Sequence, residues 1–482
     1  MKKNNLWFFL ILFLSFLFLL FSIWFHNWKV EKEKREIQEN IYNAKLLEAQ
    51  IIEDKKNIDK KLKAKIAQRY LKSNLAKIEK LKNDNCLYFQ YDDKISKITD
   101  KIENDEIDKK TNFTCLLSKI EKIKEPENLQ AIYINQHQIS RIDKYIQLAK
   151  NTKINAFIID IKEVDGKISF EIPKFLNTEN FDFISTKDMR NPQKLIQKLH
   201  KNKIYTIARI VVFKDNYFTK KHPELAIKNR KGQIWKDYKG HSYLDPTKKK
   251  VWERIIKLAK ISDIYGFDEI NFDYIRYPSD GKIEDINLEK NDKWSRVKNM
   301  DIFFDYLTKT LKKYNSNLKL SADIFGYTVL VNGNDLKIGQ IFEDIILYFD
   351  RVSPMIYPSH YGKNLMGIKN PDSSPYLVIK INSLAMEKKI KELNKKIENS
   401  LKNQKKLILF KNFSPQKENL EKVSSKNITP WIQAFNCYWC SKNWTPYQRK
   451  EIQAQITALR ESKINDYFVW NPASRYKWEW FK

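Results

Sequence analysis

Short apolar runs alternate with longer amphipathic segments from about residue 131 to the end of the chain. The runs are rich in β-branched and aromatic residues and predict strands, whereas the segments between them carry an apolar residue every three or four positions and predict helices. Eight strands are predicted, at residues 131–135, 156–162, 204–212, 268–274, 318–324, 351–357, 429–435 and 466–470. Seven helices are predicted between them, at residues 141–152, 191–202, 247–265, 296–314, 338–349, 375–399 and 447–462.

This alternation predicts an α/β fold. Strands separated by helices pair in parallel, and eight such units close into a (β/α)8 TIM barrel. An open doubly wound sheet is the alternative, but it usually carries a glycine-rich phosphate loop, and neither GxGxxG nor GxxxxGK[ST] occurs in the chain. Only a dozen residues follow the last predicted strand, too few for a full final helix, so residues 105–123 are expected to supply the missing cover.

One predicted helix has clear signals at both ends. Asp245 and Pro246 predict an N-cap and a first-turn proline, and Gly266 predicts the end of the helix before the next strand. This helix is therefore expected to begin at residue 247.

The N-terminus has an apolar run at residues 6–25, interrupted only by Ser15 and Ser22. A helix of 20 residues is about as long as the ~30 Å hydrocarbon layer is thick. The run ends at Trp24 and Trp28 rather than at small residues, which favours an uncleaved anchor over a signal peptide. We therefore expect residues 1–28 to be a single-pass membrane anchor with the barrel outside the cytoplasm.

The segment between the anchor and the barrel, residues 29–125, contains neither glycine nor proline. Apolar residues at helical spacing from about residue 58 to 78 predict a helical stalk or coiled coil. Such a stalk could pair with a second copy of the chain, and a solvated helix packed on its own domain is the alternative.

The formal net charge of +30 comes from lysines spread along the whole chain, mixed with isoleucine and asparagine. A solvated surface is therefore the favoured interpretation, and an anionic partner such as lipid head groups, an acidic glycan or nucleic acid is the weaker one. Nucleic-acid binding in particular is not expected.

The four cysteines are Cys86, Cys115, Cys437 and Cys440. They allow three disulfide pairings, among which the sequence does not choose. Cys437 and Cys440 could also be half of a zinc site, but no second pair or neighbouring histidine accompanies them, so no metal or other cofactor is expected.

Polar residues occupy the inward side of several predicted strands, because alternate residues of a barrel strand face the interior. Taking the apolar residues as facing the helices turns Glu269, Asn271 and Asp273 inward on the fourth strand, and Ser321 and Asp323 inward on the fifth. The same test on the other strands gives the inward residues Ile158, Asp160, Lys162, Arg209, Tyr357, Gln433 and Trp470.

These charged residues would lie near the C-terminal ends of the strands, where barrel enzymes place their chemistry. A buried ion-pair network, for instance Arg209 with Asp160, is the alternative to a water-filled cleft. Aromatic residues that could stack on sugar faces favour the cleft, namely Tyr277, Tyr357, Trp431 and Trp470.

Several long motifs occur in a fixed order: YGFDEINFDYIRYPS at 265–279, SADIFG at 321–326, SPMIYPSHY at 353–361, PWIQ at 430–433 and WNP at 470–472. So do residues 155–166, ARIVVFKD at 208–215 and IGQ at 338–340. With these motifs, residues 130–475 resemble a bacterial family of domains assigned to TIM-barrel glycoside hydrolases, whose reaction is not established. The resemblance implies the barrel and a carbohydrate substrate, and it leaves the anchor and stalk uncovered.

Glycosidic cleavage needs two carboxyl groups across a cleft, one protonated and one acting as nucleophile or base. We assign Asp273 as nucleophile or base and Asp323 as general acid. An acid pair on strands four and five is similar to α-amylase-like barrels, although the second acid there is usually glutamate. The remaining predicted catalytic residues are Asp160 and Glu269, the latter one layer deeper. The predicted substrate-binding residues are Arg209, Tyr357, His360, Trp431, Gln433 and Trp470.

The predicted function is hydrolysis of a cell-envelope or other polysaccharide. The alternative from another class is a catalytically silent barrel that binds a glycan or organises the envelope. Replacing Asp273 by Asn separates the two, because an enzyme loses turnover whereas a binding barrel keeps its affinity.

Overall fold

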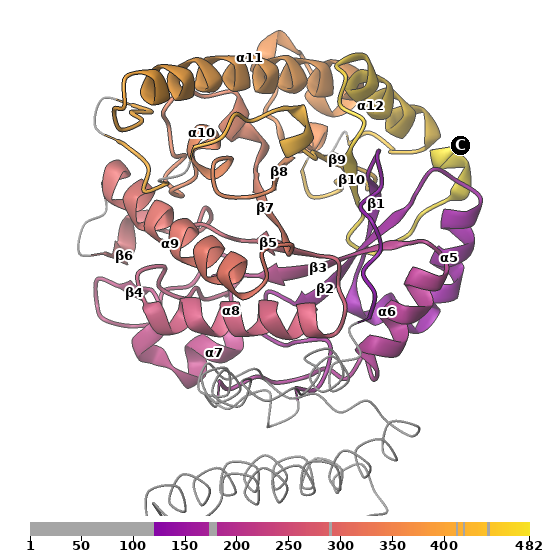
Figure 1. Ribbon diagram of the computed structural model, residues 1–482, viewed down its shortest axis with the longest axis horizontal. Coiled ribbons are helices and arrows are strands. Elements are labelled where there is room, and N and C mark those ends of the chain that lie inside the picture. Colours follow the sequence, from indigo (N-terminus) through magenta and orange to yellow (C-terminus); the bar gives the residue numbers. More distant parts are fainter. Residues whose placement is uncertain (1–119, 173–180, 289–291, 411–412, 418–419, 441–443) are drawn as a thin grey trace, which may run out of the picture. The chain divides into compact units, whose positions relative to one another are not determined.

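The computed structural model describes residues 120–482 except 173–180, 289–291, 411–412, 418–419 and 441–443 (Figure 1). The predicted anchor at 1–28 and nearly all of the predicted stalk at 29–125 lie outside this part of the chain. Among the described helices, none has both the length and the apolar composition needed to cross a membrane.

Eight parallel strands close into one barrel, as predicted. Each barrel strand pairs with the next one along the chain, and the last pairs with the first. The strands are β1 (Gln130–Ile134), β2 (Ala156–Lys162), β3 (Tyr205–Val211), β5 (Glu269–Asp273), β7 (Lys319–Phe325), β8 (Arg351–Met355), β9 (Trp431–Gln433) and β10 (Tyr467–Trp470).

Helices surround the barrel (Figure 1). The longer ones are α5 (Ile142–Lys150), α6 (Pro192–Lys201), α8 (Lys249–Ile264), α9 (Lys293–Tyr314), α11 (Pro375–Lys402) and α12 (Arg449–Glu461). The chain ends in a short 3-10 helix, Trp478–Phe481, in agreement with the expectation that no full final helix follows β10. The described helices and strands thus make an α/β barrel with the predicted order of elements.

One predicted helix is much shorter than expected. The prediction at 338–349 is reduced to the single turn of α10 (Phe342–Ile345). Gly339 has a φ of +76° and Ile341 is extended, so neither can belong to a helix. Helical periodicity in this segment therefore reflects buried apolar residues of a loop.

The predicted N-cap of α8 is wrong. The helix begins at Lys249, and its N-cap position is Lys248, which makes no side-chain cap hydrogen bond. Asp245 instead accepts hydrogen bonds from the backbone and hydroxyl of Thr247, which closes a turn ahead of the helix. The predicted end is correct, since Gly266 follows with a φ of +96°, and a Cβ there would lie 2.7 Å from that of Ile120.

The predicted inward orientation of Lys162 is also wrong. The pairing register between β2 and β3 shifts between Asp160 and Lys162, so an extra residue turns Lys162 to the other side of the sheet. Its amine there lies 3.1 Å from a carboxylate oxygen of Asp215, which also pairs with Arg254 of α8 at 3.0 Å. Asp160, on the near side of the bulge, remains inside the barrel.

Residues 120–127 lie against the N-terminal ends of the strands. The backbone N–H of Ile123 donates to Asp268, just before β5, and Glu125 pairs with Arg351 at the start of β8. Residues 120–127 therefore cover this end of the barrel, and a candidate site is to be sought at the opposite end, where the strands have their C-termini. The predicted cover at 105–123 is described only from Ile120 onward.

Candidate active site

A cavity of about 550 Å3 lies at the C-terminal ends of the barrel strands. Its lining includes seven of the ten residues singled out from the sequence, namely Arg209, Asp273, Asp323, Tyr357, His360, Trp431 and Trp470. They come from five strands and one loop, which explains why they are far apart in the chain. The parity argument thus located the cavity correctly.

Asp273 and Asp323 enter this cavity from neighbouring strands. In the register between β5 and β7, Asn271 lies opposite Ser321 and Phe272 opposite Ala322, so the next residues along are the two aspartates. Both are almost fully buried, yet both line the same cavity. The two carboxyl groups are therefore neither on opposite faces nor sealed behind apolar side chains.

Arg209 of β3 holds Asp273 in an ion pair. Its Nε and Nη2 both donate to one oxygen of Asp273, at 3.1 and 2.6 Å, while its Nη1 donates to Asp160. Hydrogen bonds between charged groups are among the stronger ones in proteins. The guanidinium therefore fixes the orientation of the Asp273 carboxyl group.

Asp323 has the opposite environment. Burial, followed by the negative charge of Asp273, raises the pKa of its carboxyl well above the usual range. Hydrogen bonds from Asn271 and Trp431 to its Oδ1 partly oppose this effect. The net effect favours the protonated form of Asp323, which is the form that a general acid needs.

Tyr274 directly follows Asp273 and has a φ of +49°, a left-handed conformation that a residue with a bulky side chain rarely adopts. Its backbone N–H donates to Oδ1 of Asp273 at 2.6 Å. The strained backbone thus supplies a second fixed donor to the carboxylate and turns the chain sharply at the end of β5.

Aromatic rings form one side of the cavity. Trp470 stacks on Tyr133 with centroids 4.0 Å apart and meets Trp431 edge-on at 5.5 Å. Tyr357 lies edge-on to His360 at 5.2 Å. Burial lowers the pKa of His360 to about 4, so its ring is neutral at physiological pH. This side of the cavity offers flat, uncharged faces.

Three of the predicted site residues are not part of the cavity lining. Asp160 is fully buried behind Arg209, where it also accepts a hydrogen bond from Tyr133. Glu269 lies deeper, 3.2 Å from Arg351, and Gln433 accepts a hydrogen bond from the backbone N–H of Ser359. Each faces inward, as predicted, and each lies beside protein partners rather than in the cavity lining.

Other lining residues were not predicted from the sequence. They include Tyr274, Arg276, Phe325, Tyr327 and Tyr361. All lie at or beyond strand ends, where the inward and outward alternation no longer applies. Tyr274 and Arg276 do belong to the longest of the sequence motifs, which was the available signal.

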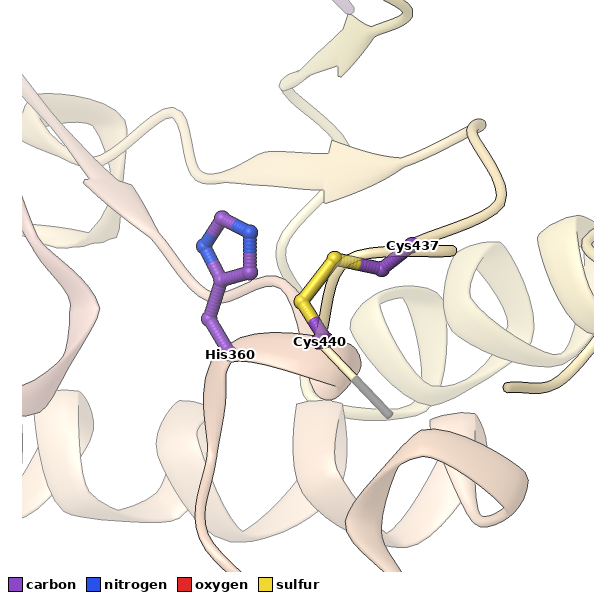
Figure 2. A group of neighbouring side chains, drawn as sticks. All are labelled: His360, Cys437 and Cys440. Atoms are coloured by element: carbon purple, nitrogen blue, oxygen red, sulfur yellow. A yellow bond between two sulfur atoms is a disulfide. The ribbon is translucent and has the colours of Figure 1, made fainter. Parts of the chain in front are cut away.

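His360 also contacts a cysteine pair near the cavity. Figure 2 shows its imidazole beside the disulfide that joins Cys437 and Cys440, one of the pairings left open by the sequence. One ring nitrogen of His360 and the two sulfurs lie within 4.8 Å of one another, a grouping of metal-ligand types that the sequence spacing did not indicate. While the disulfide is formed neither sulfur is a thiolate, which is the form that binds metals. Cys86 and Cys115 lie outside the described residues.

The comparisons with known proteins agree with this geometry. The model of a family described as "Putative glycosyl hydrolase domain" matches residues 131–409 and 399–476. The structure resembles the glycoside hydrolase domain of PgaB (BpsB) from Bordetella bronchiseptica, with 11% identity, a TM-score of 0.50, and coverage of 72% of this chain and 95% of that one. At this identity the likeness concerns the fold.

Two further solved structures are similar to parts of the chain. A hypothetical protein from Ruminiclostridium thermocellum ATCC 27405 is 33% identical, over 40% of this chain and 96% of its own, with a TM-score of 0.35. The spore cortex-lytic enzyme SleL from Bacillus megaterium QM B1551 is 10% identical, over 74% of each chain, with a TM-score of 0.39. No curated protein shows significant similarity to the chain.

Proposed function

This chain belongs to the family of glycosyl hydrolase domains, and from that premise we propose that its cavity cleaves a glycosidic bond of a polysaccharide by means of Asp273 and Asp323. One observation carries the proposal. Two carboxyl groups from neighbouring strands line one cavity, one paired with a guanidinium and the other buried without a cationic partner of its own. This difference in environment assigns the role of general acid to Asp323 and the role of nucleophile or base to Asp273.

In this mechanism Asp323 donates its proton to the oxygen of the leaving sugar. Asp273 either attacks the anomeric carbon or takes a proton from the attacking water. Arg209 orients Asp273 through their ion pair, and the faces of Trp470 and Tyr357 pack against sugar rings. Asp160 acts only through Arg209, as a positioning residue.

The proposal is tested with the full chain and a panel of bacterial envelope polysaccharides, with new reducing ends as the readout. We expect Asp273→Asn and Asp323→Asn each to lower kcat/KM by about 10²–10⁴-fold while leaving polysaccharide affinity nearly unchanged, with a cooperative melting curve showing that each variant is folded. Asp143→Asn, at an exposed position on α5, is the matched control.

Retention of activity in both variants would rule out this carboxyl pair. Binding without turnover in the parent protein would instead support the second candidate, a silent carbohydrate-binding barrel. For an active protein, the anomer of the first product, observed by NMR, distinguishes a nucleophilic Asp273 (retention) from a basic one (inversion).

We further propose that the polysaccharide belongs to the cell envelope and that residues 1–28 anchor the barrel outside the cytoplasm. The apolar run at 6–25 supports this, and a disulfide between Cys437 and Cys440 is compatible with an oxidising compartment. Protease digestion of intact cells tests the orientation, since a barrel outside the cytoplasm is exposed to the protease once the outer layers are permeable.

A further inference from the structure

Arg276 is a buried cation in the wall of the cavity. Its side chain is part of the lining, and the residue is only 6% exposed. Among the described residues no carboxylate lies within ion-pair distance of its guanidinium, whereas Arg209, Arg254, Arg296 and Arg351 each have one. Arg276 therefore differs from these other buried arginines of the barrel.

The protein holds this guanidinium mainly by its faces. Its carbon Cζ lies 4.3 Å from the ring centroid of Phe325 and 5.0 Å from that of Tyr274. One of its N–H groups, on Nη1, donates to the backbone oxygen of Tyr277 at 2.9 Å. The side chain of Tyr243 is a further neighbour of the guanidinium. A guanidinium has five N–H donors, more than these contacts use, and its rim is shaped for two parallel hydrogen bonds to a carboxylate.

Two other cations near the cavity have carboxylate partners of their own. Arg209 contacts Asp160, Asp273 and, at 3.9 Å, Glu163. Lys214, which lies over the ring of Tyr274 at 5.1 Å, pairs with Asp237 at 2.9 Å. Of the two guanidinium groups that line the cavity, only that of Arg276 has no carboxylate beside it among the described residues, and a buried charge without a partner costs free energy.

We propose that Arg276 binds an anionic substituent of the sugar chain, so that the substrate is an acidic polysaccharide with carboxylate groups, such as one containing uronic acids. This inference rests on the proposed function, because it assigns a substrate class to the same cavity. A carboxylate on a sugar ring next to the scissile bond would supply the partner that the protein itself does not provide.

The test compares each uronic-acid polysaccharide of a panel with its own carboxyl-reduced form, which keeps the backbone and removes the charge. Binding is measured by calorimetry on Asp323→Asn, because this variant lacks the proposed general acid and should bind the polymer without cleaving it. We expect at least one charged polymer to bind at least about tenfold more tightly than its reduced form, in proportion to one charge-assisted bidentate contact.

Arg276→Gln in the same background should lower affinity for the charged polymer to within about twofold of the reduced form, with the reduced form bound as before. Arg190→Gln, which removes one charge at an exposed position outside the cavity, should keep the preference. Arg276→Lys keeps the charge without the two-pronged rim and should give an intermediate preference, which guards against a misfolded glutamine variant.

Equal binding of charged and reduced polymers by the Asp323→Asn protein overturns the inference, as does an equal loss for both polymers in Arg276→Gln. Glucuronate and glucose, compared by saturation-transfer NMR, distinguish this failure from failure of the proposed function. If the protein hydrolyses a neutral polymer but shows no preference for glucuronate over glucose, Arg276 is not an anion-binding site and the hydrolase function stands. If the protein binds glucuronate through Arg276 but hydrolyses no glycan, the hydrolase function is wrong and the anion-binding site stands.

Discussion

The indole Nε1 of Trp431 donates a hydrogen bond to Oδ1 of Asp323, across 2.8 Å. Asn271 donates to the same oxygen at 2.9 Å, and among the described residues Oδ2 accepts none of the hydrogen bonds found. The two donors therefore leave Oδ2 as the oxygen that carries the proton. In this way β9 and β5 decide which side of a carboxyl group on β7 can act as an acid.

Replacing Trp431 by Phe should move the high-pH limb of kcat/KM to higher pH. The lost hydrogen bond favours the ionised form of Asp323, so its loss raises the pKa of this carboxyl further. A hydrogen bond worth about 1 kcal/mol corresponds to a displacement of roughly 0.7 pH unit. Trp470→Phe is the control, because Trp470 lines the same cavity; a limb displaced to lower pH in Trp431→Phe would contradict the assignment.

Replacing Asp323 by Asn should stabilise the protein in a pH-dependent way. Because the pKa of Asp323 is raised on folding, its contribution is fully favourable at acidic pH and is lost as the pH rises through the folded-state value. The variant should therefore be close to the parent in stability near pH 4 and more stable than the parent at pH 8. Urea unfolding at both pH values measures this. A constant difference would show that Asp323 does not titrate differently in the two states.

Replacing Arg209 by Met should reduce both stability and turnover. Asp273 and Asp160 would then be left as buried carboxylates without their cation, which costs about 3–5 kcal/mol. Adding Asp160→Asn to this variant should recover part of the stability but not the turnover, since Asp273 still lacks its partner. Additive losses in the double variant would mean that Arg209 and Asp160 do not act together.

His360 should titrate with a pKa of about 4, because burial lowers it. Because the same ring in the unfolded chain takes up its proton near pH 6.5, the stability that comes from burying the neutral form is lost as the pH falls from about 6.5 toward 4. The charge of the folded ring itself should hardly change between pH 5 and 8. NMR of the ring protons, assigned by comparison with His360→Gln, gives the value directly. A pKa near 6.5 would mean that the ring is open to water.

The sequence correctly predicted which side chains face the interior wherever the strands are regular. Asp273 and Asp323 were located from alternation alone, because β5 and β7 pair without a break in register. Lys162 was assigned to the wrong side because a bulge leaves no mark in the hydrophobic pattern. Arg276 was missed because it lies beyond β5, where the direction of the chain depends on the positive φ of Tyr274.

Depth along the barrel axis was the other quantity that alternation could not provide. Glu269 and Asp273 face the same way on one strand, yet Glu269 is paired with Arg351 near the closed end and only Asp273 reaches the cavity. Gln433 was predicted as a ligand contact, but a loop that follows β8 binds its amide through Ser359. Loop paths of this kind depend on tertiary contacts and not on local periodicity.

The bulge in β2 gives the spacing of this strand a significance of its own. Asp160 and Lys162 would share a side on a regular strand, but here they belong to two separate clusters of charge, with Arg209 and with Asp215. Deleting a single residue between them would bring an amine next to the guanidinium inside the barrel, while any substitution of that residue keeps the count. At this point of the chain, the number of residues matters more than their identity.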